Sequence, residues 1–148
     1  MGLSMKSECI IDKYGNRHWY LNGNLHRTDG PAIELNNGDK YWRLNGILHR
    51  VDGPAVECAD GTKKWYLNEK LHRVDGPAIE WADGDKYWYL NGKFHRTDGP
   101  AIEYTDGIKV WYLNGKELTF KQWLSAVWDT LSKEEQKKYA FNGFQYEE

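Results

Sequence analysis

A 23-residue unit repeats along most of this 148-residue chain and constrains the fold more than any other feature. Five tryptophans spaced by that period align the units: Trp19, Trp42, Trp65, Trp88 and Trp111. Four units are complete, and a fifth begins as GIKVWYLNGKEL before it diverges. Upstream, the segment 9–11 (Cys-Ile-Ile) aligns with the Ala-Ile-Glu of the later units, which indicates a half-unit that opens the array.

Each unit has the composition of β-structure. A run such as Lys-Tyr-Trp-Tyr-Leu favours a strand, and the Asn-Gly that follows in most units predicts a type I′ hairpin turn. Unit three carries Asn68-Glu69 instead, so its turn is expected to be the most strained or of another type. After the return strand, Asp-Gly-Pro ends the pairing and a short Ala-Ile-Glu strand follows. Alternation places Trp42 and Leu44 on one face, and we expect that face to point inward.

The pattern predicts a mainly β chain, an open array of tandem antiparallel β-hairpin repeats with a small C-terminal helical cap. Residues 1–14 form an N-terminal half-repeat or cap, residues 15–118 hold four and a half β-repeats, and residues 119–148 form the helical cap and tail. Two strands per unit give an advance of about 10 Å per repeat.

After Gly115 the hydrophobic period changes to that of a helix. The stripe consists of Phe120, Trp123, Leu124, Val127, Trp128 and Leu131. Thr119 is suited to be its N-cap, and Ser132 with Glu135 matches a capping box that opens a second short helix. The tail from Ala140 onward is predicted to be turn-like. The helix is interpreted as a lid on the array, or as a docking or dimerisation surface formed by Trp123 and Trp128.

The 23-residue period, the Gly-Asp-Lys-Tyr opening of two units and the Asn-Gly-Lys turn followed by His resemble MORN repeats over residues 8–118. The Trp-Tyr-Leu-Asn-Gly and His-Arg wording departs from the usual MORN pattern and is similar to repeats in predicted phage and giant-virus proteins. The resemblance implies a scaffold for protein or membrane contact rather than an enzyme.

A His-Arg-x-Asp-Gly-Pro segment occurs four times and contains the residues most suited to chemistry. They are His26, Arg27, His49, Arg50, His72, Arg73, His95 and Arg96, with an Asp two residues after each Arg. Four equal copies argue against a catalytic site, which needs one asymmetric set, so no catalytic residue is assigned. The segment is interpreted as turn chemistry, with Arg paired to Asp or stacked on Trp, or alternatively as a column that binds an anion or nucleotide. Histidines about 10 Å apart cannot share a metal ion, and no metal or cofactor is expected.

The positions that vary between units are candidates for partner binding. One column holds Tyr20, Arg43, Tyr66 and Tyr89, and another holds Leu35, Cys58, Trp81 and Tyr104. Varied aromatics on a fixed frame suit a recognition surface, although outward strand positions also tolerate such variation.

Composition narrows the function classes further. A net charge of −2 gives no excess of Lys and Arg for binding duplex nucleic acid. Two isolated cysteines predict no disulfide framework, and the sequence shows no signal-peptide h-region and no apolar run of membrane-spanning length. These features predict a cytoplasmic protein, in the host cytoplasm if the chain is viral.

The favoured hypothesis is a non-enzymatic protein-binding repeat module, such as a phage-type inhibitor or adaptor acting on a host protein. The alternative is a small-ligand or nucleotide binder that uses the repeated Arg and His column. An open array also has sheet edges that pair readily with another chain, which favours a homodimer.

Overall fold

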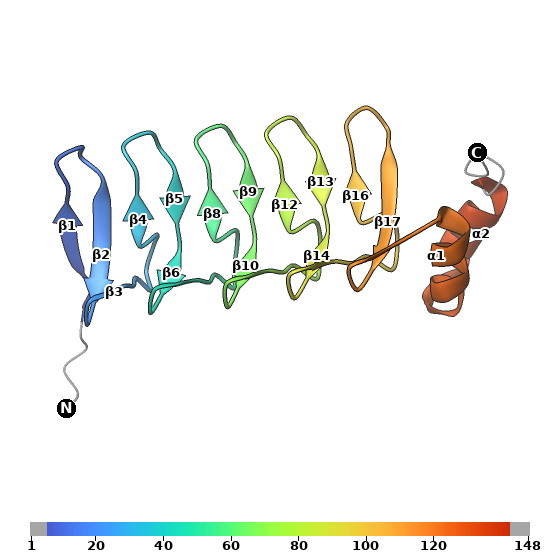
Figure 1. Cartoon of the computed structure of the whole chain (residues 1–148), viewed down its shortest axis with the longest axis horizontal. Helices are drawn as coiled ribbons and strands as arrows, with labels where there is room; N and C mark the ends of the chain where they lie inside the picture. The colour runs from blue at the N-terminus through green and yellow to red at the C-terminus, as the bar shows by residue number, and fades with distance from the viewer. Residues whose placement is uncertain (1–5, 143–148) are drawn as a thin grey trace.

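The computed structural model describes residues 6–142 as a row of β-hairpins that ends in two short helices (Figure 1). This confirms the predicted β-hairpin array with a helical cap. The hairpins lie side by side along the long axis, and the helices sit at the C-terminal end of the row.

The strands follow the repeat. The half-unit and the first unit hold β1 (Glu8–Ile11), β2 (Arg17–Leu21), β3 (Asn24–Leu25) and β4 (Ile33–Glu34). Each of the next three units adds four two-residue strands: β5 (Lys40–Tyr41), β6 (Arg43–Leu44), β7 (Ile47–Leu48), β8 (Val56–Glu57), β9 (Lys63–Lys64), β10 (Tyr66–Leu67), β11 (Lys70–Leu71), β12 (Ile79–Glu80), β13 (Lys86–Tyr87), β14 (Tyr89–Leu90), β15 (Lys93–Phe94) and β16 (Ile102–Glu103). The partial unit ends the array with β17 (Lys109–Leu113) and β18 (Lys116–Leu118).

One antiparallel sheet runs through every unit in the order β1-β2-β4-β5-β8-β9-β12-β13-β16-β17-β18, with β3 paired to β2. The Ala-Ile-Glu strand of each unit therefore lies between two strands that each contain or directly precede a repeat tryptophan, as β4 lies between β2 and β5. The other halves of the hairpins form separate two-stranded ladders, β6-β7, β10-β11 and β14-β15.

In the three middle units, the backbone switches at the tryptophan from pairing within the long sheet to pairing within its own hairpin. The Trp42 N–H donates to the Ala55 carbonyl at 2.8 Å, and the Trp42 carbonyl accepts the His49 N–H at 3.2 Å. Neighbouring hairpins are also joined beyond this point, since the Gly46 N–H donates to the Leu25 carbonyl at 2.8 Å. The array is thus held together by backbone hydrogen bonds in both halves of every hairpin.

The hairpin turns have the positive φ angles that a type I′ turn requires. Asn22, Asn45, Asn91 and Asn114 have φ of 50° or 51°, and a glycine with positive φ follows each. In unit three Asn68 has φ 50° and Glu69 has φ 65°. The turn keeps the same geometry, so the predicted strain falls on Glu69, whose Cβ is disfavoured at positive φ.

The cross-strand register gives the sheet two different faces. On one face oppositely charged residues alternate from strand to strand: Arg17, Glu34, Lys40, Glu57, Lys63, Glu80, Lys86, Glu103 and Lys109. The other face carries the buried side chains of Val56, Ile79 and Ile102 beside Tyr41 and Tyr87.

The expectation that the repeat tryptophans point into a core is wrong for four of the five. Trp19, Trp42, Trp65 and Trp88 are only half-buried, because the array is one sheet thick and no second sheet or helix of the described residues covers their face. The fully buried repeat residues are the small ones, Ala32, Ala55, Ala78 and Ala101, which are 0% exposed. In a one-layer sheet, residues are buried between neighbouring units and not under a second layer.

The main hydrophobic cluster lies under the cap, which comprises α1 (Phe120–Val127), the 3-10 helix η1 (Trp128–Thr130) and α2 (Lys133–Asn142). Thr119 caps α1 as predicted, and the capping box of Ser132 and Glu135 opens α2. The predicted stripe does not form one helix to Leu131, since α1 ends at Val127. The prediction of a turn-like tail is wrong for residues 140–142, which belong to α2. The rest of the tail lies outside the described residues.

Candidate functional site

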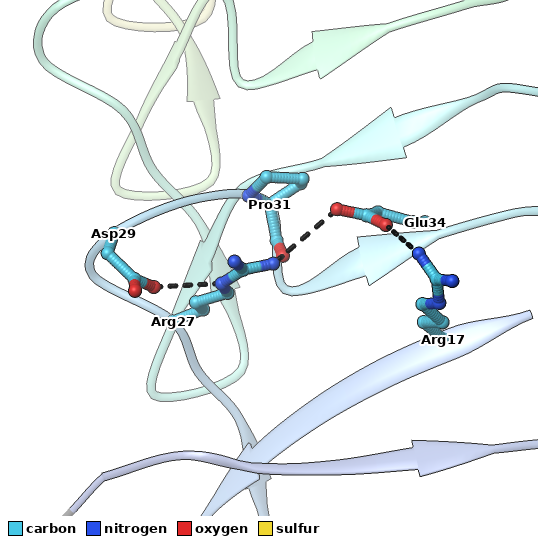
Figure 2. Close-up of polar contacts among 5 residues, drawn as sticks. All are labelled: Arg17, Arg27, Asp29, Pro31 and Glu34. Carbon is cyan, nitrogen blue, oxygen red and sulfur yellow. Dashed lines mark hydrogen bonds and ion pairs between the residues drawn. The ribbon is translucent and has the colours of Figure 1, made fainter.

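The repeated arginine is held in place by contacts within its own unit (Figure 2). The Arg27 Nε donates to the Asp29 carboxylate at 2.8 Å, and Nη1 donates to the Pro31 carbonyl at 3.3 Å and to Glu34 at 3.4 Å. Glu34 also accepts a contact from Arg17 at 3.4 Å. One guanidinium thereby connects the Asp-Gly-Pro loop to the strand that follows it.

The same arrangement recurs at Arg50, Arg73 and Arg96, with the Nη1–Glu distance shortening to 3.1, 2.9 and 2.7 Å. Each guanidinium also lies over the tryptophan of its unit, with 3.8–4.1 Å between the guanidinium carbon and the ring centroid. The hydrogen bond from the arginine lowers the pKa of Asp29, Asp52 and Asp75 below the usual value. Each arginine has two carboxylate partners, so this column has no unbalanced positive charge.

The repeated histidine connects one unit to the next. His26 Nδ1 accepts the backbone N–H of Asn45, in the hairpin turn of the following unit, at 3.1 Å. The equivalent bonds run from Asn68 to His49, from Asn91 to His72 and from Asn114 to His95, at 3.0–3.3 Å. The geometry of all four His-Arg-x-Asp segments therefore matches the turn-chemistry interpretation. In each segment the arginine Nε and Nη1 and the histidine Nδ1 are engaged in hydrogen bonds within the array.

Clefts open between successive His-Arg-x-Asp-Gly-Pro loops. The first, of about 710 Å³, lies between Arg27 and Arg50 with Trp42 and Leu44 among its walls. Equivalent clefts of about 720 and 570 Å³ follow in the next two units. Their size suits a small ligand. Their walls, however, pair each arginine with an aspartate.

The two varied columns lie on the face of the sheet opposite the clefts, and other aromatic side chains connect them there. Tyr20, Arg43, Tyr66 and Tyr89 are half-buried and pair across the hairpin with Leu25, Leu48, Leu71 and Phe94. In the C-terminal half the rings form a continuous surface, here called the aromatic strip: Trp81, Tyr87, Tyr89, Phe94, Tyr104 and Tyr112. Sequence alternation could have found Tyr87 and Tyr112, which share this face, but only the fold shows the rings in contact.

Stacking fixes the rings of the aromatic strip. Phe94 stacks between Tyr89 and Tyr112, with centroid distances of 4.1 and 5.0 Å and interplanar angles of 30° and 29°. Tyr87 meets Trp81 and Tyr104 edge-on at 5.9 Å. Burial and a hydrogen bond with Tyr104 raise the pKa of Tyr87 to about 12. In the first two units Leu35 and Cys58 stand where Trp81 and Tyr104 stand later. Burial raises the pKa of the Cys58 thiol, which disfavours a reactive thiolate.

Two residues that break the repeat pattern contact each other. Arg43 stands where other units have Tyr, and its Nη1 lies 3.5 Å from the carboxylate of Glu69, which stands where other units have Gly. The same Glu69 oxygen accepts the Leu48 N–H at 2.8 Å, and Arg43 Nη1 donates to the Gly46 carbonyl at 2.6 Å. The structure shows that the two deviations converge on each other as an ion pair.

Restoring the repeat residues at both positions should stabilise the chain. We expect Arg43→Tyr with Glu69→Gly to raise the free energy of unfolding by about 1 kcal/mol, because glycine removes the strain at positive φ. The pair should also be coupled by at least about 0.5 kcal/mol in a double-mutant cycle measured by denaturant unfolding. Single changes whose effects simply add would show that the two side chains do not interact.

The two candidate tryptophans of the cap differ in accessibility. Trp123 is 0% exposed, and its Nε1–H donates to the Arg96 carbonyl at 2.8 Å. Its ring lies 4.4 Å from Trp111, the position that an arginine covers in earlier units. Trp123 therefore has a structural role and not the docking role considered above, because its side chain has no exposed surface that a partner could contact. Trp128 is 36% exposed and remains a candidate.

No protein-family model matches the chain, and no curated protein is significantly similar to it. Within residues 6–142, no group of three or more His, Cys, Asp or Glu side chains is arranged to hold a metal ion. Neither described helix has the length and apolarity needed to cross a membrane.

Proposed function

We propose that this chain is a non-enzymatic protein-binding module of MORN-like repeats, which acts as an inhibitor or adaptor by presenting the aromatic strip to a protein partner. The stacked series Tyr89, Phe94 and Tyr112 carries the proposal. Rings already held by their neighbours lose little conformational entropy when a partner covers them.

The chemistry of the strip favours a protein partner over a charged ligand. Tyrosine hydroxyls supply neutral hydrogen-bonding groups, and Trp81 adds a partly exposed indole with the Lys64 ammonium 4.8 Å from its ring centroid. Tyrosine and tryptophan are the residues most enriched among those that dominate binding energy at protein interfaces. The strip also lies in one half of the array, since Leu35, Cys58 and Arg43 interrupt it in the first two units.

Affinity capture followed by titration tests the proposal. We expect wild-type protein to retain a stoichiometric partner, and Trp81→Ala or Tyr104→Ala to weaken its binding at least tenfold, as truncation of a central aromatic contact does. Val74→Ala is the matched control, because Val74 is 84% exposed and lies on a loop that lines the opposite clefts. Thermal unfolding of each variant must show that the fold is intact.

Two results would count against the proposal: no stoichiometric partner, or a partner whose affinity is unchanged by both strip variants. The small-ligand alternative is favoured only by the size of the clefts beside Arg50 and Arg73. A nucleotide that raises Tm in the wild type would support that alternative, since a ligand bound to the native state must stabilise it.

A further inference from the structure

Within the described residues 6–142, the first strand is an edge of the sheet with no strand paired to its outer side. In the sheet order β1 is terminal and pairs with β2. All four of its residues are exposed, and Ile10 and Ile11 are 56% and 63% exposed. Natural edge strands usually carry charges that prevent pairing with another chain. Here Ile11 occupies the position held by Glu34, Glu57, Glu80 and Glu103 in the later units, so the alternating charges stop at Arg17.

The outer side of β1 has backbone hydrogen-bonding groups that no strand of the described part of the chain pairs with. The Asp12 N–H donates to the Asn16 carbonyl within the hairpin, so by alternation the backbone of Ile10 faces β2. The N–H and C=O groups of Cys9 and Ile11 then face outward. Their equivalents in the first full unit are Ala32 and Glu34. The Ala32 carbonyl accepts the Trp19 N–H of the preceding strand while the Ala32 N–H donates to the Tyr41 carbonyl, and Glu34 lies opposite Arg17. In every complete unit, the equivalent edge is paired with an antiparallel strand.

We propose that β1 pairs antiparallel with β1 of a second copy of the chain, about a two-fold axis that passes between the two Ile10 residues. The Cys9 and Ile11 backbones of one copy bond to the Ile11 and Cys9 backbones of the other. This register buries only apolar side chains at its centre, with Cys9 against Ile11 on one face and Ile10 against Ile10 on the other. It also places Glu8 opposite Asp12 at each end, a like-charge pair that opposes the pairing, while the Asp12 carboxylate accepts hydrogen bonds from Asn16 and the Tyr14 N–H.

A second copy fits the edge better than an open-ended series of copies. The other end of the array is closed, because α1 packs against β17 and β18. Pairing through β1 alone uses the same surface on both molecules, so assembly stops at two. This interface is separate from the aromatic strip, and the proposal does not depend on the proposed function.

The oligomeric state and its response to one charge test the proposal. Sedimentation and light scattering should give a mass of twice 17.4 kDa for wild type at high concentration. Ile11→Glu restores the residue of the other units opposite Arg17, so it should fold normally but lose the dimer. Ile108→Glu is the matched control, since Ile108 is 57% exposed at the far end and should leave the dimer unchanged. A monomer at every concentration, or a dimer that survives Ile11→Glu, would overturn the proposal.

Cross-linking tests the register independently. With Cys9 and Cys58 replaced by serine, Ile10→Cys should form a disulfide-linked dimer on mild oxidation, because residues directly opposite in a non-hydrogen-bonded pair have Cα atoms about 4.5 Å apart. Ile11→Cys in the same background should not cross-link, since its Cα and the equivalent Cα of the other copy lie about 8 Å apart or more. Equal cross-linking at both positions would rule out this register.

Discussion

Trp123→Ala is expected to lower the free energy of unfolding of the C-terminal part of the chain by about 3–5 kcal/mol, the usual range for a buried tryptophan. Trp123 has no exposed surface and packs against Trp111 and Tyr139, with ring centroids 4.4 and 5.4 Å away. The substitution also removes the indole N–H that donates to the Arg96 carbonyl. Denaturant unfolding followed by circular dichroism measures the loss.

The effect should be local, because units of a repeat array contact only their neighbours. Amide hydrogen exchange should speed up in β17 and β18 while β4 and β5 keep their protection. Trp128→Ala serves as the matched control: this tryptophan is 36% exposed, and we expect a cost below about 1 kcal/mol. Similar costs for the two tryptophans would contradict the lid interpretation of the cap.

The repeat made most of the fold predictable. The period located the strands, Asn-Gly located the hairpin turns, and the helical stripe with Thr119 and Ser132 located the cap and its two helix starts. These features depend on residues near one another in the sequence. The end of α1 at Val127 and the extension of α2 to Asn142 were not predictable in this way, because contacts with the array decide them. Among those contacts, the Tyr139 hydroxyl donates to the Asp98 carbonyl at 2.8 Å.

Contacts between units were the part that the sequence did not reveal. Arg43 and Glu69 are 26 positions apart, and only the register of neighbouring hairpins brings them together. Likewise, unit five has Thr119 where earlier units have the stacking arginine, and the cap supplies Trp123 in its place. The candidate binding residues were predicted only as two columns, and their contact through Phe94 and Tyr87 depends on the three-dimensional packing of the hairpins.

Arg73→Ala is expected to destabilise the array by about 2–3 kcal/mol. It removes the guanidinium stacked 4.0 Å from the Trp65 ring centroid, a contact worth about 0.5–2 kcal/mol. It also removes the charged hydrogen bonds to Pro77 and Glu80, at 3.2 and 2.9 Å. Arg73→Lys should recover less than half of the loss, because an ammonium group lacks the planar face and the divergent N–H donors of arginine. Thermal and denaturant unfolding measure both variants.

Arg17→Ala is the matched control for Arg73→Ala, since Arg17 also contacts a glutamate of the sheet but is 58% exposed, against 22% for Arg73. Exposed ion pairs contribute about 0–1 kcal/mol, so this change should have little effect. If Arg73→Ala were as mild as Arg17→Ala, the repeated arginine would not be needed for the fold. Its fourfold presence beside open clefts would then require a ligand, and the small-ligand hypothesis would replace the structural one. A large loss for Arg73 alone assigns the His-Arg-x-Asp-Gly-Pro segment to stability and leaves the opposite, aromatic face for recognition.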